Sequence, residues 1–107
     1  MRDTKLCNAI GLAMKAGKLV SGDFAAEKTI RAKRAKLILL DADASDNTAD
    51  KYGQLARAKG CGLVSVEALG DAIGKPARMV AAVTDDNFKK LILGAVQGAD
   101  GNETTRG

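Results

Sequence analysis

The chain has 107 residues, which is enough for one domain with a single hydrophobic core. Apolar residues make up 46% of it and charged residues 28%, an ordinary balance for a globular protein. No apolar run approaches the roughly 20 residues that a membrane-spanning helix needs, and Lys15 and Lys18 interrupt the N-terminal apolar stretch. Histidine, the commonest general base, is absent, and Cys7 and Cys61 have no neighbouring ligand for a metal. We therefore expect a cytoplasmic protein that is not an enzyme, holds no metal or cofactor, does not bind membranes, and uses both cysteines for packing.

The net charge of +4 hides an uneven distribution along the chain. Residues 1–40 hold nine Lys and Arg against three acids, a net charge of +6. Residues 41–107 hold eight basic and ten acidic residues, a net charge of −2. Such an asymmetry indicates a basic surface that faces a polyanion, most simply nucleic-acid phosphate. The alternative is that the charge serves solubility alone.

Hydrophobic periodicity predicts five helical and four extended segments. Gly17, Gly60 and Gly74 follow helical patterns and are expected to end those helices in the left-handed conformation. The run Leu37–Leu40 is apolar on both faces, which suits a central strand with helices on either side. Two predicted helices cover residues 4–16 and 67–73. Three others follow capping residues: one runs from a cap at residue 21 or 22 to residue 33, one from a cap at 45 to 59, and one from a cap at 84 or 85 to 96. The predicted strands cover residues 18–21, 37–40, 63–66 and 79–83.

Strands that alternate with helices predict an α/β fold, a single-domain three-layer α-β-α sandwich with a four-stranded mixed sheet. The inner stripe of the last helix is expected to consist of Phe88, Leu91, Ile92, Ala95 and Val96. We expect the domain to span residues 1–98 and residues 99–107, which are glycine-rich and polar, to form a disordered tail.

Catalytic and nucleotide-binding motifs are missing. Gly60-Cys61-Gly62 follows a helix and precedes a strand, the reverse of a nucleotide-binding turn, so we interpret it as a helix cap. Asp41, Asp43 and Asp46 follow a strand end, where carboxylates hold magnesium in some α/β enzymes. Without a phosphate-binding loop, we interpret them as a solvated loop with helix-capping acids. A small enzyme would need Asp41, Asp43 and Lys36 in one concave pocket.

The second predicted helix carries the strongest local signal. Its start at Gly22 offers free backbone N–H groups and the positive end of the helix dipole to a phosphate. Cations lie on the helix and just past its end: Lys28, Arg31, Lys33, Arg34 and Lys36. Together these features suit a cradle for an RNA backbone. The alternative is a solvated amphipathic helix in which Glu27 pairs with Arg31, and the sequence leaves both readings open.

Several short stretches resemble the kink-turn-binding ribosomal protein L7Ae family, in particular its bacterial, YlxQ-like branch. They follow one another in order from about Leu6 to Leu93, so the resemblance covers nearly the whole domain. It implies an α-β-α sandwich that binds kinked, internally looped RNA. The stretches are Gly17-Lys18-Leu19-Val20-Ser21-Gly22, Lys28 with Ile30, Ala35-Lys36-Leu37-Ile38-Leu39-Leu40, Asp43-Ala44-Ser45, Leu69-Gly70, Ile73-Gly74-Lys75 and Val80-Ala81-Ala82-Val83-Thr84-Asp85.

In this family the start of the second helix enters the widened major groove at tandem sheared G·A pairs, with the pattern Gly-x-Asn-Glu-x-x-Lys. Gly22 and Lys28 match that pattern, whereas Phe24 and Ala25 replace the Asn-Glu pair that would read guanine edges. Asp23 is a candidate replacement acceptor. RNA binding is expected to survive, because phosphate contacts dominate affinity, while selectivity for a standard kink-turn is expected to weaken.

The resemblance implies further contacts outside this helix. The family's basic strand position falls on Lys18, an expected phosphate contact, and its base-packing loop falls on residues 74–78. We predict a non-catalytic, monomeric protein that recognises structured, kink-turn-like RNA, with ribosome association as a further expectation. The alternative is a protein-interaction module of the same fold with weakened RNA specificity, favoured if Phe24 is exposed. The predicted RNA-binding residues are Lys18, Gly22, Asp23, Phe24, Lys28, Arg31, Lys33, Arg34, Lys75, Ala77 and Arg78.

Overall fold

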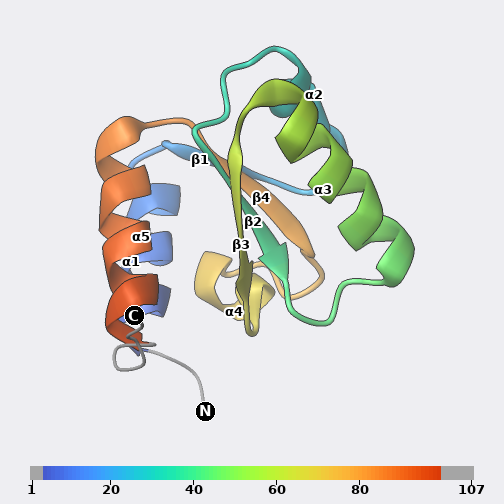
Figure 1. Cartoon of the computed structure of the whole chain (residues 1–107). Helices are drawn as coiled ribbons and strands as arrows, with labels where there is room; N and C mark the ends of the chain where they lie inside the picture. The colour runs from blue at the N-terminus through green and yellow to red at the C-terminus, as the bar shows by residue number, and fades with distance from the viewer. Residues whose placement is uncertain (1–3, 100–107) are drawn as a thin grey trace.

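The computed structural model describes residues 4–99, with side chains described as far as Val96 (Figure 1). Helices and strands alternate through this part of the chain, as the periodicity predicted. Their bounds are α1 Thr4–Lys15, β1 Leu19–Ser21, α2 Asp23–Arg31, β2 Leu37–Asp41, α3 Asp46–Lys59, β3 Gly62–Val66, α4 Leu69–Ile73, β4 Val80–Val83 and α5 Asp86–Ala99. The tail expected from residue 99 onward lies outside the described residues, apart from Ala99, which ends α5.

The strands form one mixed sheet in the order β1-β4-β2-β3. β2 pairs parallel with β3, and β4 runs antiparallel to both β1 and β2. All five residues of β2 are buried, which confirms the prediction of a central strand. Leu37 and Leu39 pack toward α1, α4 and α5, whereas Ile38 and Leu40 pack toward α2 and α3. The sheet is therefore the middle layer of a three-layer α-β-α sandwich, as predicted (Figure 1).

Local sequence signals account for most of the helix ends. Ser45 caps α3, since its hydroxyl accepts a hydrogen bond from the Thr48 N–H at 3.2 Å. Gly17, Gly60 and Gly74 take the left-handed conformation that was predicted, with φ between 65° and 88°. These three glycines leave the connections short and keep the helices on the sheet.

The structure corrects two helix bounds and one member of the inner stripe of the last helix. α4 begins at Leu69 rather than at residue 67, because Ala68 takes a left-handed conformation (φ 54°) that a helix cannot include. α2 ends at Arg31, and Lys33 closes it with a left-handed φ of 61°. Leu91 does not belong to the inner stripe of α5: it is 47% exposed, because Phe88, Ile92 and Ala95 already form the seam that meets the core.

The two ends of the sheet gather different connecting segments. At the first, here called the Gly22 end, β1, β2 and β3 finish and β4 begins, so the start of α2 meets the loop of residues 74–79. At the second, here called the Lys36 end, β2 and β3 begin and β4 finishes, and the chain passes through residues 16–18, 32–36 and 84–85. The Lys36 end lies at the top of Figure 1.

Candidate nucleic-acid interface

The start of α2 is fixed to the first residue of β4. The Gly22 N–H donates a hydrogen bond to the Val80 carbonyl oxygen at 2.9 Å. Gly22 has a φ of 96°, which side-chain-bearing residues rarely adopt, and a Cβ there would lie 2.6 Å from Nη1 of Arg78. The Arg78 guanidinium therefore lies against the glycine backbone. No side chain caps α2, so its first N–H groups keep no partner from a capping residue.

The loop of residues 74–79 is held against α4 by a second close backbone approach. A Cβ on Gly70 would lie 2.5 Å from the Pro76 carbonyl oxygen and 2.8 Å from that of Lys75. The Lys75 N–H donates to the Gly70 carbonyl at 2.9 Å. Because backbone stands on both sides of this contact, only glycine fits at position 70. The loop is thereby presented to solvent in one defined position.

A groove of about 260 Å³ lies between the start of α2, α3 and this loop. It brings together four predicted site residues from distant parts of the sequence, Gly22, Asp23, Ala77 and Arg78. Ala77 and the 41%-exposed Met79 give the loop an apolar rim. Thr48 and Met79 were not predicted as site residues, because their place here depends on the packing of α3 and β4. The residues that line the groove are Gly22, Asp23, Thr48, Ala77, Arg78, Met79 and Val80.

Asp23 is tied to α3. Its backbone carbonyl accepts a hydrogen bond from the Tyr52 hydroxyl at 3.1 Å, and its Oδ1 accepts another from the same hydroxyl. Lys51 Nζ lies 3.4 Å from Oδ1. Burial, and secondarily the hydrogen bond to Asp23, raise the pKa of Tyr52 well above its ordinary value. One oxygen of the expected base acceptor is therefore occupied in holding α2 onto α3.

Glu27, which belongs to the same network, forms ion pairs that offset positive charge on α2 and α3. Arg31 Nε lies 2.8 Å from Oε2 of Glu27, the pairing that the alternative interpretation of this helix predicted, and Lys51 Nζ lies 2.7 Å from Oε1. Hydrogen bonds from Lys51 and Arg31 lower the pKa of Glu27, and the bond to Glu27 raises the pKa of Lys51. Glu27 thus offsets the charge of Arg31 while leaving that of Lys28 unpaired among the described residues.

Phe24 projects from the first turn of α2 with 81% of its surface exposed. It shares a shallow depression of about 260 Å³ with Glu27, Lys28 and Arg31. A large exposed aromatic next to an unpaired cation, Lys28, is unusual for a solvated helix face. The exposure of Phe24 is the feature that the protein-interaction alternative predicted.

Three other predicted residues do not reach this site. Lys18 lies at the Lys36 end, where its carbonyl accepts from the Thr84 N–H at 2.9 Å. Lys33 and Arg34 lie past the last turn of α2, whose nine residues span about 14 Å. The structure therefore divides the single cradle expected from the sequence into two groups of cations. Lys75 stays with the Gly22 end, exposed on its loop.

The pocket that a small α/β enzyme would need is not formed by its expected residues. The 7%-exposed Asp41 accepts hydrogen bonds from the Asp43 N–H at 2.7 Å and the Leu69 N–H at 2.9 Å, so it joins α4 to the end of β2. Lys36 lies at the other end of β2. Among residues 4–96, no group of three or more His, Cys, Asp or Glu is placed to hold a metal.

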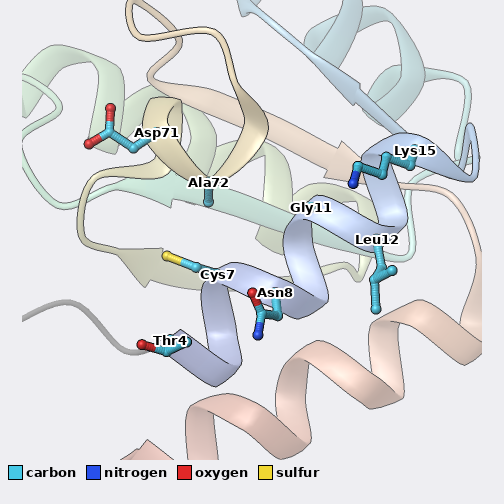
Figure 2. Close-up of a pocket in the computed structure, with 8 residues that line it drawn as sticks. All are labelled: Thr4, Cys7, Asn8, Gly11, Leu12, Lys15, Asp71 and Ala72. Carbon is cyan, nitrogen blue, oxygen red and sulfur yellow. The ribbon is translucent and has the colours of Figure 1, made fainter.

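Neither cysteine lines the groove between the start of α2 and the loop of residues 74–79. Burial raises the pKa of the Cys61 thiol, which donates to the Ala35 carbonyl oxygen at 3.6 Å. Cys7 lines a groove of about 610 Å³ between α1 and α4, with Lys15 and Asp71 at its margins (Figure 2). The Cys61 thiol therefore lacks the lowered pKa of a reactive cysteine.

In the described part of the chain no helix combines the length and apolar character required to cross a bilayer. Among curated proteins, the chain is 45% identical over 87 residues to the RNA-binding protein YlxQ of Bacillus subtilis, a match that covers 78% of this chain and 87% of that one. It is 35% identical over 97 residues to the RNA-binding protein YlxQ of Enterococcus faecium, covering 88% and 93% of the two chains.

Solved structures share the fold. A protein of unknown function from Bacillus halodurans superposes with a TM-score of 0.81 at 27% identity, covering 87% of this chain and 97% of that chain. The Giardia lamblia 15.5kD RNA binding protein superposes with a TM-score of 0.70 at 19% identity, covering 91% and 86%, a likeness of fold alone. The model of the ribosomal protein L7Ae/L30e/S12e/Gadd45 family matches residues 4–93. The chain belongs to the ribosomal protein L7Ae/L30e/S12e/Gadd45 family.

Proposed function

We propose that this protein is a non-catalytic, monomeric, cytoplasmic RNA-binding protein and that the Gly22 end contacts structured, kink-turn-like RNA. The observation that carries the proposal is the joint between the start of α2 and the loop of residues 74–79, made by the Gly22–Val80 hydrogen bond and the stacked Arg78 guanidinium. It puts uncapped helix N–H groups beside two loop cations, Lys75 and Arg78. Such an arrangement is suited to a phosphate backbone that turns sharply. The curated relatives named RNA-binding protein YlxQ support the same class of ligand.

Lys28 is the cation of α2 best placed to bind phosphate in this proposal. It is exposed, lies on the same helix as Gly22 and has no carboxylate partner among the described residues. Arg31 is the weaker candidate, since Glu27 accepts its Nε hydrogen bond. We assign Asp23 to the positioning of α2 through Tyr52 rather than to base reading.

Phe24 offers the RNA a stacking surface in place of the hydrogen bonds that an Asn-Glu pair would make. An exposed aromatic ring at the mouth of a basic site can stack on a base that the kink turns out of its helix. Stacking tolerates any base, so it would add affinity while reading little sequence. We therefore propose that selectivity rests on the shape of the RNA more than on guanine edges. We also propose that the protein associates with the ribosome, where structured RNA of this kind occurs.

A second candidate function is docking to another protein through the same ring. The 81% exposure of Phe24 favours it, because aromatic side chains dominate the binding energy of protein interfaces. The two functions differ in what the neighbouring cations do. RNA binding needs Lys28 as well as Phe24, whereas an apolar protein contact needs Phe24 alone.

The test compares Lys28→Ala, Phe24→Ala and Arg57→Ala in salt-titrated binding to a kink-turn RNA. Arg57 is an exposed cation on α3, so its variant controls for the loss of one charge. We expect Lys28→Ala to weaken binding several-fold and to lower the slope of log K against log salt by about 1, and Arg57→Ala to do neither. Phe24→Ala should weaken binding with little change in slope. Full RNA binding by both site variants would contradict the proposal, and loss of a protein partner with Phe24→Ala alone would support docking.

A further inference from the structure

A second set of cations gathers at the Lys36 end, on the side of the sheet that carries α2 and α3. Leu19 and Leu37 both pair with Val83, so the residues before them, Lys18 and Lys36, lie on either side of β4. Two strand spacings, about 10 Å, separate their backbones. The left-handed turn at Lys33 brings the end of α2 to the same place, because the Arg34 N–H bonds to the Thr29 carbonyl at 3.0 Å. We call this set the Lys36 patch: Lys18, Lys33, Arg34 and Lys36.

Hydrogen bonds to the end of β4 hold both lysines at this end of the sheet. The Thr84 N–H donates to the Lys18 carbonyl at 2.9 Å, which continues the β1–β4 register, so Lys18 projects from the same face as Val20, the face that packs under α2 and α3. Lys36 precedes β2 in a bend, and its N–H donates to the Val83 carbonyl. Lys33 and Arg34 follow the end of α2, which packs on that same face.

No carboxylate neutralises this surface. Within residues 4–96, none of the patch side chains forms an ion pair. At the same end of the sheet, Asp85 and Asp86 lie at the start of α5, which packs on the opposite face, and Asp85 accepts a hydrogen bond from the Phe88 N–H at 3.0 Å. By contrast, the Gly22 end mixes its cations with Asp43, Asp46 and Glu67. The strongest unpaired positive charge is thus at the end away from the α2 start.

The composition of the patch identifies its ligand as a phosphate backbone. The large exposed apolar side chains of the described residues are Leu12, Phe24, Met79 and Leu91, and none belongs to the patch. A protein interface or a membrane-inserting surface would be expected to carry apolar anchors. A cationic surface without such anchors is suited to phosphates, which it contacts without reading bases, and three of its four cations, Lys18, Lys33 and Arg34, are exposed.

We propose that the Lys36 patch binds the backbone of a second segment of the same RNA that the Gly22 end holds. This inference rests on the proposed function. α2 is the spacer between the two surfaces, and its length of about 14 Å sets how far the RNA must continue beyond the kink to reach the patch. An RNA with a long stem engages both surfaces, and one cut close to the kink engages only the Gly22 end.

The test uses a kink-turn RNA with a long stem and the same RNA with that stem cut back. The patch variant is Lys33→Gln with Arg34→Gln, and its control is Arg57→Gln with Lys90→Gln. The control removes the same charge from the exposed outer surfaces of α3 and α5. Gln keeps the aliphatic part of each side chain, so folding should be unaffected, and circular dichroism checks this.

We expect the wild type to bind the long-stem RNA about three- to tenfold more tightly than the cut RNA. The patch variant should bind the two RNAs with equal affinity, and it should bind the cut RNA as the wild type does. On the long-stem RNA, the slope of its log K against log salt should be lower than that of the wild type by about 2. The control double variant should keep the difference. Equal wild-type affinity for the two RNAs, or equal losses in the patch and control variants, overturns the proposal.

The outcomes for Lys75→Ala separate this proposal from the proposed function, because Lys75 is exposed on the loop at the Gly22 end. If the Gly22 end binds RNA and the patch does not, Lys75→Ala weakens binding to both RNAs and the patch variant changes neither. If the patch binds RNA and the Gly22 end does not, the pattern is reversed. Binding of the patch to vesicles of anionic lipid in preference to RNA would also overturn the assignment.

Discussion

Tyr52 and Asp23 show how single residues hold the candidate site in place. Tyr52 is fully buried, yet its hydroxyl reaches across from α3 to both the backbone and the carboxylate of Asp23, the first residue of α2. A buried hydroxyl that lost these acceptors would leave a polar group without a partner. The pair therefore fixes the direction in which the start of α2 faces.

Tyr52→Phe tests this link through its pH dependence. The folded state raises the pKa of Tyr52 above its unfolded value of about 10, so the unfolded chain loses the proton first as the pH rises. The stabilisation is present in full below that pH and is lost above it. The variant should be about 1 kcal/mol less stable at pH 8, and its stability should fall less between pH 9 and 11 than that of the wild type. Urea denaturation under reducing conditions measures both, and parallel pH profiles would show that the Tyr52 proton is not coupled to folding.

Residue identities could be predicted from the sequence where a local pattern carries them. Gly22 and Lys28 were found from the helix start and the family pattern, and the Glu27–Arg31 pair from its spacing. The tie between Asp23 and Tyr52 could not be found in this way, since the two residues are 29 positions apart and meet only when α2 packs on α3. Thr48 was missed for the same reason.

At the scale of elements, the loop of residues 74–79 depends on the absence of a side chain at position 70. Backbone oxygens of Lys75 and Pro76 stand where a Cβ would go, and neither is a flexible group that could move aside. The sequence predicted a loop here from its proline, but it did not indicate that α4 and the loop touch through backbone. The helix and strand bounds, by contrast, were predicted closely, because caps and periodicity are local.

Gly70→Ala should displace the loop. We expect a loss of about 1–3 kcal/mol in the free energy of unfolding and a several-fold weaker affinity for RNA. Gly94→Ala is the matched control, because Gly94 lies in α5 with no atom within 4 Å of a built Cβ. That variant should be neutral or more stable by up to about 1 kcal/mol, since alanine favours the helix. Thermal unfolding and RNA-binding assays on both variants measure these effects. Unchanged RNA affinity in a destabilised Gly70→Ala protein would show that the loop does not contact RNA.

At the scale of the whole molecule, the fold turns one basic stretch of sequence into two surfaces. The sequence places nine basic residues in its first 40 positions. The sandwich places Lys75 and Arg78 at the Gly22 end and Lys18, Lys33, Arg34 and Lys36 at the other. Lys28 lies between them on the last turn of α2, and Glu27 pairs with Arg31. Net charge along the chain predicted the polyanion ligand but not this division, which depends on where α2 ends and how β1 and β2 flank β4.

A salt-titrated comparison of a kink-turn RNA with a straight duplex of equal length and base composition tests whether the Gly22 end recognises the kink. We expect both RNAs to bind and both affinities to fall as salt rises. A preference for the kinked RNA should persist at every salt concentration, because shape and Phe24 stacking do not depend on counterions. Equal affinity for the two RNAs at every salt concentration would contradict the claim that the Gly22 end recognises the kink.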